Sequence, residues 1–415
     1  MGIIKSCCSG LHTCLLNNFR LFIFRRLCYF ISIFFLTFCV FMPAFTFRLQ
    51  FSAYNWPRSA TFQTALEKQA NDVRAEKAKW RIEHARNGEL TKSFRNSSNL
   101  LGVSVLITVI SMRRDTIDGY DPMYLSQVMT ETVDLYRRFQ TIGGDPNFFR
   151  LVLCNIDPLP QSYVELNKLA EVYKIHTFTR FLNSRPSDYE NRNRHLKERN
   201  DYIYCLRKSL ELNPRYVILL EDDALPIKDA FWVIYNTVTN SLERYLKIHL
   251  NEKLGFVKFY HPYRFFDRVV YWELLGFSSF FGTILTTFHY FLSKDKSFVY
   301  MNWFFYILLV FLIGVTLGYA NLLKMRHLST HLYTMIPSRD CCTPAVLFSN
   351  SSGHDFADYF DKHPCHSESC PKDLLLRPFL RDTKSQGLMV LPNIYDHIGL
   401  YSIVQKRVKH PDVLN

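Results

Sequence analysis

Short apolar runs alternate with longer amphipathic segments along much of the chain. Apolar runs bounded by turn residues predict buried strands, and segments with apolar positions at helical spacing predict helices. The predicted strands are Leu101–Met112, Phe149–Cys154, Tyr173–Phe178, Tyr216–Leu220 and Gly255–Tyr260. The predicted helices are Pro122–Phe139, Gln161–Val172, Asp188–Asn213 and Asp229–Leu250. This strand–helix alternation predicts an α/β domain with a parallel sheet.

Much longer apolar stretches occupy Leu27–Phe47, Trp272–Leu292 and Phe298–Tyr319, and each is long enough to cross a bilayer. Arg25 and Arg26 precede the first stretch and favour a cytosolic N-terminus. The first stretch is too long for an ordinary signal-peptide core and has no small-residue cleavage pattern, so we predict a signal anchor. The other two predict a transmembrane hairpin; the alternative is a pair of buried core helices.

The predicted topology is consistent with the charge at the hairpin tip. If the chain after the anchor is lumenal, the tip Ser293–Ser297 is cytosolic, and it carries Lys294 and Lys296. Gly314 and Gly318 are expected to let the two arms approach closely.

These features predict the organisation of the whole chain. Residues 1–26 form a cytosolic tail, 27–47 a transmembrane signal anchor, 48–100 a lumenal stem, 101–271 the first part of the α/β domain, 272–319 the hairpin and 320–415 the second part. Within the stem, residues 58–87 are highly charged and predict a packing or stem helix, because apolar residues recur at near-helical spacing: Phe62, Leu66, Val73 and Trp80.

The formal net charge of +13 over 415 residues does not indicate a nucleic-acid partner. The Lys and Arg residues are scattered rather than gathered on one face, and no nucleic-acid-binding motif is present. An anionic diphosphate ligand and anionic lipid are the better partners for this charge.

The 11 cysteines contain no paired CxxC motifs of a zinc fold. Those on the predicted lumenal side lie in an oxidising compartment, where disulfides persist: Cys154, Cys205, Cys341, Cys342, Cys365 and Cys370. The sequence leaves their pairing open, with Cys365–Cys370 as the local candidate. Glycosylation sequons begin at Asn96 and Asn350. Gly2 begins a minimal myristoylation pattern, followed by the possible palmitoylation sites Cys7 and Cys8.

The main candidate for chemistry follows the predicted strand Tyr216–Leu220. Glu221, Asp222 and Asp223 arrive together at its carboxyl end, where ligands bind in open α/β sheets. A divalent cation would relieve the repulsion between them; the alternative is an acidic first turn of a helix after Pro226.

A pair of cations follows the first predicted strand. Arg113 and Arg114 could meet a diphosphate or a base there, and a solvated loop pair is the alternative.

An acidic triplet after a buried strand of a lumenal α/β domain resembles the GT-A glycosyltransferases, which have a Rossmann-type fold. Further stretches carry the resemblance. Cys341–Phe348 (CCTPAVLF) resembles the loop and strand beside the donor sugar, and Cys370–Leu376 (CPKDLLL) the motif that carries the catalytic base. Leu391–Ser402 (LPNIYDHIGLYS) resembles the segment with a metal-binding His. Together with the split by a hairpin, the order of these motifs resembles the Golgi GPI-glycan N-acetylgalactosaminyltransferases of the post-GPI-attachment family.

The resemblance implies an inverting transfer of GalNAc from UDP-GalNAc to the core mannose of the GPI glycan. It implies a multi-pass Golgi membrane enzyme with a lumenal catalytic domain, and GPI-anchored proteins, the UDP-sugar and the bilayer as partners. Asp222, Asp223 and His397 would hold Mn²⁺ or another divalent cation, and Asp373 would be the base. Residues expected to contact the nucleotide sugar are Arg113, Arg114, Glu221, Asp222, Thr343 and Ala345.

Several alternatives stay open at this point. Lys372 stands where the wider GT-A motif usually has an acid, and Asp340, Asp355 and Asp358 are other candidates for the base. The donor could instead be UDP-Gal or UDP-GlcNAc, used on another lipid-linked or protein glycan. A non-catalytic membrane scaffold with a degenerate fold is the alternative of a different class.

Overall fold

The computed structural model describes residues 24–49, 51–55, 60–86, 102–114, 121–182, 194–248, 252–263, 270–292, 299–338, 341–363, 371–402 and 407–408. The chain divides into two compact units: Met1–Pro57 with Phe266–Met325, and Arg58–Phe265 with Arg326–Asn415. Some sequence predictions fall outside the described residues: acylation at Gly2, Cys7 and Cys8, the sequon at Asn96, the hairpin tip Ser293–Ser297, the Cys365–Cys370 pairing and Asp340.

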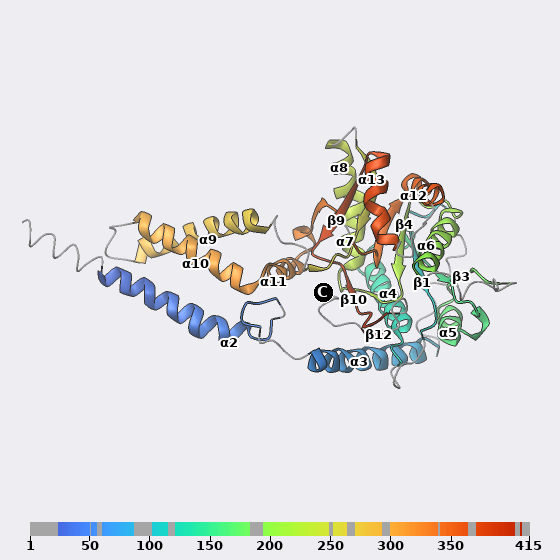
Figure 1. Ribbon diagram of the computed structural model, residues 1–415, viewed down its shortest axis with the longest axis horizontal. Coiled ribbons are helices and arrows are strands. Elements are labelled where there is room, and N and C mark those ends of the chain that lie inside the picture. The colour runs from blue at the N-terminus through green and yellow to red at the C-terminus, as the bar shows by residue number, and fades with distance from the viewer. Residues whose placement is uncertain are drawn as a thin grey trace, which may run out of the picture. The chain divides into compact units, whose positions relative to one another are not determined.

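The larger unit is built on an eight-stranded sheet with the order β3-β2-β1-β4-β8-β6-β9-β7 (Figure 1). Its strands are β1 (Val105–Ser111), β2 (Phe149–Asn155), β3 (His176–Thr179), β4 (Tyr216–Glu221), β6 (Lys253–Lys258), β7 (Thr334–Pro337), β8 (Ala345–Ser349) and β9 (Ser385–Leu391). The strands β3, β2, β1 and β4 are parallel, and so are β6 and β9. Each predicted strand is therefore present, with small shifts of its ends.

The sheet is mixed rather than wholly parallel, which differs from the prediction. β8 is antiparallel to both β4 and β6, and β7 is antiparallel to β9. The backbone N–H of Glu221 donates to the Pro344 carbonyl (2.8 Å), so the loop before β8 already lies at the carboxyl end of β4. A strand that begins at the carboxyl end of β4 must run antiparallel to β4 and β6.

Two small sheets complete the strands of this unit. β5 (Ala224–Pro226) pairs antiparallel with β10 (Tyr395–His397), and β11 (Tyr401–Ser402) pairs with β12 (Arg407–Val408).

Helices cover both faces of the large sheet, as α/β alternation requires. The described helices of this unit are α3 (Ala60–Arg86), α4 (Tyr124–Thr141), α5 (Val164–Tyr173), α6 (Arg194–Leu210), α7 (Ala230–Asn236), α8 (Leu242–Ile248), α12 (Asn350–Lys362) and α13 (Leu376–Thr383). A π-helical turn, Thr237–Ser241, joins α7 to α8 within the predicted helix Asp229–Leu250. Short 3₁₀ turns lie at Pro160–Ser162, Met325–Leu328, Thr330–Leu332 and Lys372–Leu375.

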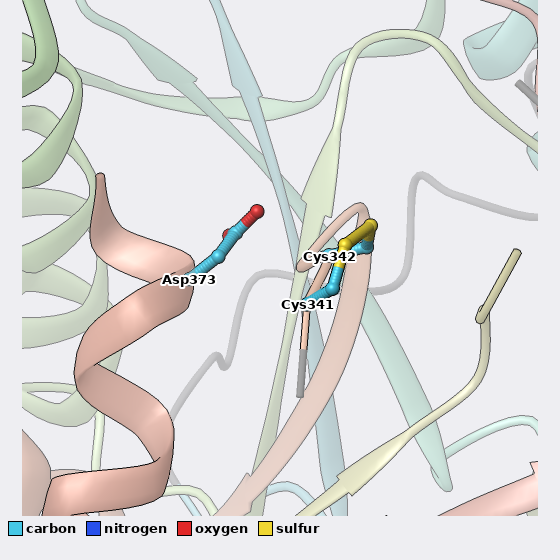
Figure 2. A group of neighbouring side chains, drawn as sticks. All are labelled: Cys341, Cys342 and Asp373. Atoms are coloured by element: carbon cyan, nitrogen blue, oxygen red, sulfur yellow. A yellow bond between two sulfur atoms is a disulfide. The ribbon is translucent and has the colours of Figure 1, made fainter. Parts of the chain in front are cut away.

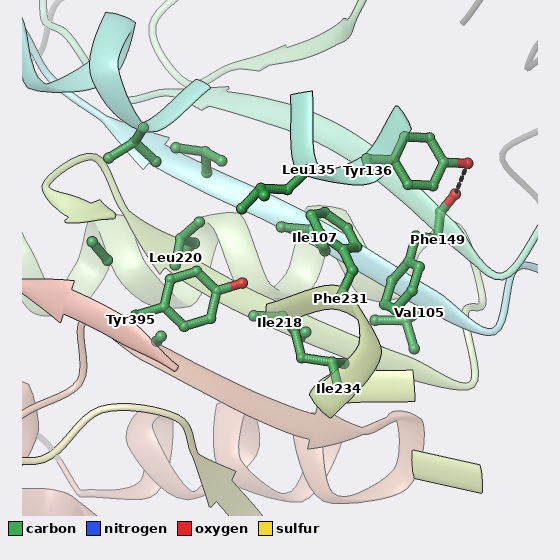
Figure 3. Packing of buried hydrophobic residues seen from close by; sticks show 14 of the residues in the cluster. Val105, Ile107, Leu135, Tyr136, Phe149, Ile218, Leu220, Phe231, Ile234 and Tyr395 are labelled. Carbon is green, nitrogen blue, oxygen red and sulfur yellow. Dashed lines mark hydrogen bonds between the residues drawn. The ribbon is translucent and has the colours of Figure 1, made fainter. Parts of the chain in front are cut away.

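Alternate residues of β4 belong to different hydrophobic cores. Ile218 and Leu220 of β4 pack into the core that includes residues of α4, α5 and α7, as Figure 3 shows in part. Val217 and Leu219, one position along, pack into the core formed with α6, α12 and α13. Because successive side chains of a strand point to opposite faces, a continuous apolar run is what a strand buried on both faces requires.

Helix α3, in the stretch expected to be a stem, packs against α4. Arg81 binds Glu131 and Asp134 of α4, and Ile82 is part of a core. Three of the four residues whose spacing predicted the helix face outward: Leu66, Val73 and Trp80 are 37%, 66% and 58% exposed, and the side chain of Phe62 lies outside the described part. The buried face consists of Asn71, Ala75, Ala78, Ile82 and Ala85, and its small residues carry little hydropathy signal.

A disulfide between Cys154 and Cys205 joins the end of β2 to α6, with Cα atoms 5.9 Å apart. Both cysteines are fully buried within a core. The sequence placed these residues in the same compartment but did not pair them.

The smaller unit contains the helix Phe24–Thr46, α9 (Val270–Leu292), α10 (Val299–Leu317) and α11 (Tyr319–Lys324). The first helix includes a π-helical stretch, Leu36–Phe41, and ends as α2 (Met42–Thr46). It packs against α10. The rings of Phe30 and Phe305 stack with their centroids 4.1 Å apart, and Phe38, Met42 and Leu309 form a small core.

Glycines set the contact between α9 and α10. A β-carbon on Gly314 would collide with Leu274, and one on Gly282 would lie 2.8 Å from the Ile307 backbone nitrogen. The expectation for Gly314 is therefore confirmed, and Gly282 was missed. Gly318 instead lies against the Phe51 carbonyl in the segment after the first helix, so its predicted role between the arms is wrong.

Two described helices are long and apolar enough to cross a membrane, Phe24–Thr46 and Val299–Leu317. The third predicted span, α9, is not one of these two helices. It contains several hydroxyl residues, each of which donates to the carbonyl four residues earlier: Ser278, Ser279, Thr283, Thr286 and Thr287. These bonds satisfy the hydroxyl groups within the helix itself.

We predict that Gly282→Val separates α9 from α10, because the added side chain must displace the Ile307 backbone. Overpacking of this kind costs about 1–3 kcal/mol. The melting temperature of the full chain in detergent should fall. Gly276→Val is the matched control, since nothing lies within 4 Å of a β-carbon at that position of α9. An equal fall in both variants would show that valine in α9, and not the contact, is responsible.

Candidate active site

The acidic triplet lies at the carboxyl end of β4, where the sequence predicted a ligand site. Glu221 is the last residue of β4, and Asp222 and Asp223 form the turn into β5. The two aspartates are only 6% and 5% exposed. Carboxylates at this depth require cations or hydrogen-bond donors, because burial penalises their charged form.

His397 is brought to the triplet by the small sheet. Its partner in the β5–β10 pairing is Ala224, and the N–H of Ile398 donates to the Asp223 carbonyl. His397 Nε2 consequently lies 3.4 Å from Asp223 Oδ2. One ligand atom from each of Glu221, Asp223 and His397 falls within 4.8 Å of the others.

The donor set suits a divalent cation. Carboxylate oxygens and an imidazole nitrogen are ligands that Mn²⁺ accepts. Gly399 lines the same place: a β-carbon there would overlap Asp223 Oδ2 and come 3.1 Å from His397 Nε2. The absence of a side chain at Gly399 keeps the space between these groups open.

Asp222 has different neighbours from Asp223. It accepts a hydrogen bond from Ser111 Oγ (3.0 Å), which in turn contacts the Tyr163 hydroxyl (2.6 Å). Burial raises the pKa of Asp222, the nearby Asp223 raises it further, and Arg114 opposes both effects.

Arg114 binds both aspartates directly. Its Nη2 contacts Asp222 and lies 2.9 Å from Asp223 Oδ2, while Nη1 donates to the Tyr401 carbonyl (2.8 Å). Its guanidinium lies over the Tyr124 ring, 4.7 Å from the centroid. Burial alone would lower the pKa of Arg114, but the two aspartates outweigh burial and raise it.

Arg113, the neighbouring residue, is more exposed. Its side chain is 44% exposed, its backbone N–H donates to Asp157 and its Nη1 donates to Ser162. The two arginines that the sequence treated alike therefore occupy different environments.

Lys372 is the cation that balances Glu221. Its ammonium lies 3.1 Å from Glu221 and also contacts Glu198 of α6. Burial alone would lower the pKa of Lys372, but the charges of Glu198 and Glu221 raise it well above its usual value. Burial raises the pKa of Glu221, and Lys372 limits this rise. The lysine that departs from the wider motif therefore has an electrostatic role in this chain.

Asp373 faces the loop before β8 (Figure 2). Its Oδ1 accepts a hydrogen bond from Thr343 Oγ1 (2.6 Å). Cys341 and Cys342 in this loop are joined by a disulfide, so their sulfurs are not thiolate metal ligands. Both have positive φ angles, 85° and 66°, and the buried Lys258 donates to the Cys341 carbonyl. Ala345, the first residue of β8, pairs with Leu220 beside the triplet.

The other described candidates for the base lie elsewhere. Asp355 and Asp358 of α12 line a hollow together with Lys253 and Ser385, the first residues of β6 and β9. That is the opposite end of these strands from Lys258 and the triplet.

Sequence reasoning missed several residues that contact the site: Ser111, Tyr124, Tyr163, Glu198, Lys258 and Gly399. Ser111 could have been found, because it lies near the carboxyl end of the first predicted strand, Leu101–Met112, and that strand lies beside the triplet strand. Glu198 and Lys258 carry no local signal, since their roles depend on long-range contacts.

Carboxylates, an imidazole and buried cations gather at the carboxyl ends of the strands of an open α/β sheet, the place where ligands bind in such folds. The class is that of the glycosyltransferases. Over residues 105–396 the sequence matches the family described as GPI-N-acetylgalactosamine transferase PGAP4. The match covers well over half of the 415 residues, and the chain belongs to this family.

We predict that Lys372→Met destabilises the α/β unit by about 3–5 kcal/mol, because it leaves Glu198 and Glu221 without their shared cation. Thermal unfolding of the full chain in detergent would show the loss. Lys247→Gln on the exposed face of α8 is the control and should leave the melting temperature unchanged. An unchanged melting temperature for Lys372→Met would mean that this ion cluster does not hold the fold together.

Proposed function

We propose that this chain transfers GalNAc from UDP-GalNAc to the core mannose of the GPI glycan, with inversion at the sugar and with a divalent cation. The proposal rests on the family and, above all, on one observation: Asp223 and His397 face each other at the carboxyl end of the sheet, 3.4 Å apart. We assign the larger unit to the GT-A class on the same grounds.

The residues that would hold the cation are Asp223 and His397, with Glu221 as the third group within reach. Asp222, which the sequence predicted to be a ligand, instead forms an ion pair with Arg114 and accepts a hydrogen bond from Ser111. When bound, a divalent cation such as Mn²⁺ acts as a Lewis acid that offsets the charge building on a leaving diphosphate.

Asp373 is our candidate for the general base. An inverting transfer joins the acceptor oxygen to the anomeric carbon as the bond to UDP breaks, and the hydroxyl proton must be taken up. The bond from Thr343 fixes one carboxylate oxygen of Asp373 and leaves the other to accept this proton. Thr343 and Ala345 belong to the loop and strand that we place beside the donor sugar, and we assign Arg113 to the nucleotide because its side chain is 44% exposed.

We further propose a multi-pass Golgi membrane protein with a lumenal α/β unit. The two helices that are apolar enough to span support membrane attachment. The self-bonded hydroxyl groups of α9 are compatible with a third span. The buried disulfide Cys154–Cys205 supports an oxidising compartment.

A donor panel tests the activity. The purified full chain should release UDP from UDP-GalNAc, in the presence of a GPI-glycan acceptor, faster than from UDP-Gal or UDP-GlcNAc. Chelation with EDTA and the variant Asp223→Ala should each remove the activity, and Mn²⁺ should restore only the wild type. Full turnover in EDTA would contradict the cation, and a preference for another sugar would contradict the donor.

A second experiment tests the base. Asp373→Asn keeps the shape of the side chain and its hydrogen bond with Thr343, so UDP binding should persist while turnover falls by roughly a hundredfold or more. Asp358→Asn on α12 is the matched control, with a side chain 67% exposed. Near-normal turnover in Asp373→Asn would show that another group takes the proton.

A further inference from the structure

Arg114 connects two parts of the site that are far apart in the sequence. One of its nitrogens binds the aspartate pair Asp222 and Asp223, and the other donates to the Tyr401 carbonyl. Its side chain is only 11% exposed. The Tyr124 ring supports its flat face, and the Tyr124 hydroxyl accepts a hydrogen bond from the Tyr401 N–H (3.3 Å).

The C-terminal segment is held in two different ways on either side of Gly399. Before it, the backbone pairs with β5, and Ile398 donates to the Asp223 carbonyl. After it, both backbone groups of Tyr401 bind the Arg114–Tyr124 pair. Gly399 lies between these anchors against Asp223. The segment Gly399–Ser402, which also pairs with β12, is therefore joined to the aspartates through Arg114, whereas Tyr395–His397 is held by β5.

We propose that Arg114 is a positioning residue that holds the segment Gly399–Ser402 closed against Asp222 and Asp223, and not a ligand of the donor diphosphate. This rests on the proposed function only in taking the aspartates as the reactive end of the site. The sequence alone made Arg114 a nucleotide contact. In the structure, both terminal nitrogens of the Arg114 guanidinium already bind the aspartates and the Tyr401 carbonyl.

The chemistry of the guanidinium explains why an arginine fits this place. It is planar, with donors fixed in a fork and a face that stacks on aromatic rings. These features serve the carboxylates, the carbonyl and the Tyr124 ring at the same time. A lysine ammonium carries the same charge at a single point and cannot serve all of them.

Hydrogen exchange of the full chain in nanodiscs, in EDTA and without donor, tests the inference directly. In Arg114→Lys the amides of Leu400 and Tyr401, which donate to the Ile398 carbonyl and the Tyr124 hydroxyl, should exchange roughly tenfold or more faster than in the wild type. The reason is that the charged hydrogen bond from Arg114 to the Tyr401 carbonyl, which holds this segment in place, is lost. The Ile394 amide, which donates to the Phe259 carbonyl, should be unchanged. Arg113→Lys is the matched control and should leave all these amides unchanged.

Chemical rescue separates positioning from a general loss of structure. In Arg114→Ala, methylguanidinium added well below denaturing concentrations should restore both the protection of Tyr401 and sugar transfer. Ammonium, which has the charge but not the shape, should restore neither. Rescue by ammonium would show that charge alone suffices and would overturn the role of the fork.

The outcomes distinguish this inference from the proposed function. Unchanged exchange at Leu400 and Tyr401 together with weaker UDP binding in Arg114→Lys would make Arg114 a diphosphate ligand and overturn the inference. The exchange measurement uses no sugar donor or acceptor, so its result stands even if the enzyme proves to use a different sugar.

Discussion

The α/β unit depends on balancing the negative charge buried at the end of β4. Glu221, Asp222 and Asp223 are consecutive, and burying an ion without a partner costs several kcal/mol even after relaxation. Arg114 forms ion pairs with the two aspartates, and Lys372 forms an ion pair with Glu221. Each cation comes from a distant part of the chain, so the site forms only when the sheet is correctly assembled.

The topology of the sheet explains how these cations arrive. β1 lies beside β4, with Ile110 opposite Glu221, so a residue just past β1 reaches the aspartates. β8 begins on the other side of β4, with Ala345 opposite Leu220. Its entry loop places Thr343 against Asp373, next to Lys372. A turn with three acids is stable here because Arg114, just past β1, and Lys372, in the 3₁₀ turn before α13, both reach this edge.

Local patterns in the sequence were sufficient to predict the strands and helices. They were not sufficient to predict which strands pair or which charged residues contact one another. Apolar runs placed every parallel strand except β9, and a strand followed by acids located the site, because both signals lie within a few residues. The antiparallel direction of β8 depends on the end of the sheet at which the chain re-enters. A short stretch of sequence carries no information about that point. Arg113 and Arg114 look equivalent in sequence, yet only Arg114 reaches the buried aspartates. The ion pair of Lys372 with Glu198 joins segments that carry no common motif.

The long insertion after β6 joins the α/β unit at the edge of the sheet that carries the site. β6 ends at Lys258, and beyond it the backbone N–H and carbonyl of His261 both bond to the side-chain amide of Asn393 in the C-terminal segment. The chain returns at β7, whose first residue, Thr334, pairs with Leu391 at the carboxyl end of β9. Both connections therefore run beside the segment that carries His397. An acceptor fixed to lipid presents its glycan near a membrane surface, and confining an enzyme near that surface raises the effective concentration of the two. The two links to the apolar helices leave the α/β unit at the end of the sheet that carries the candidate site, which suits the transfer to a lipid-linked glycan that we propose.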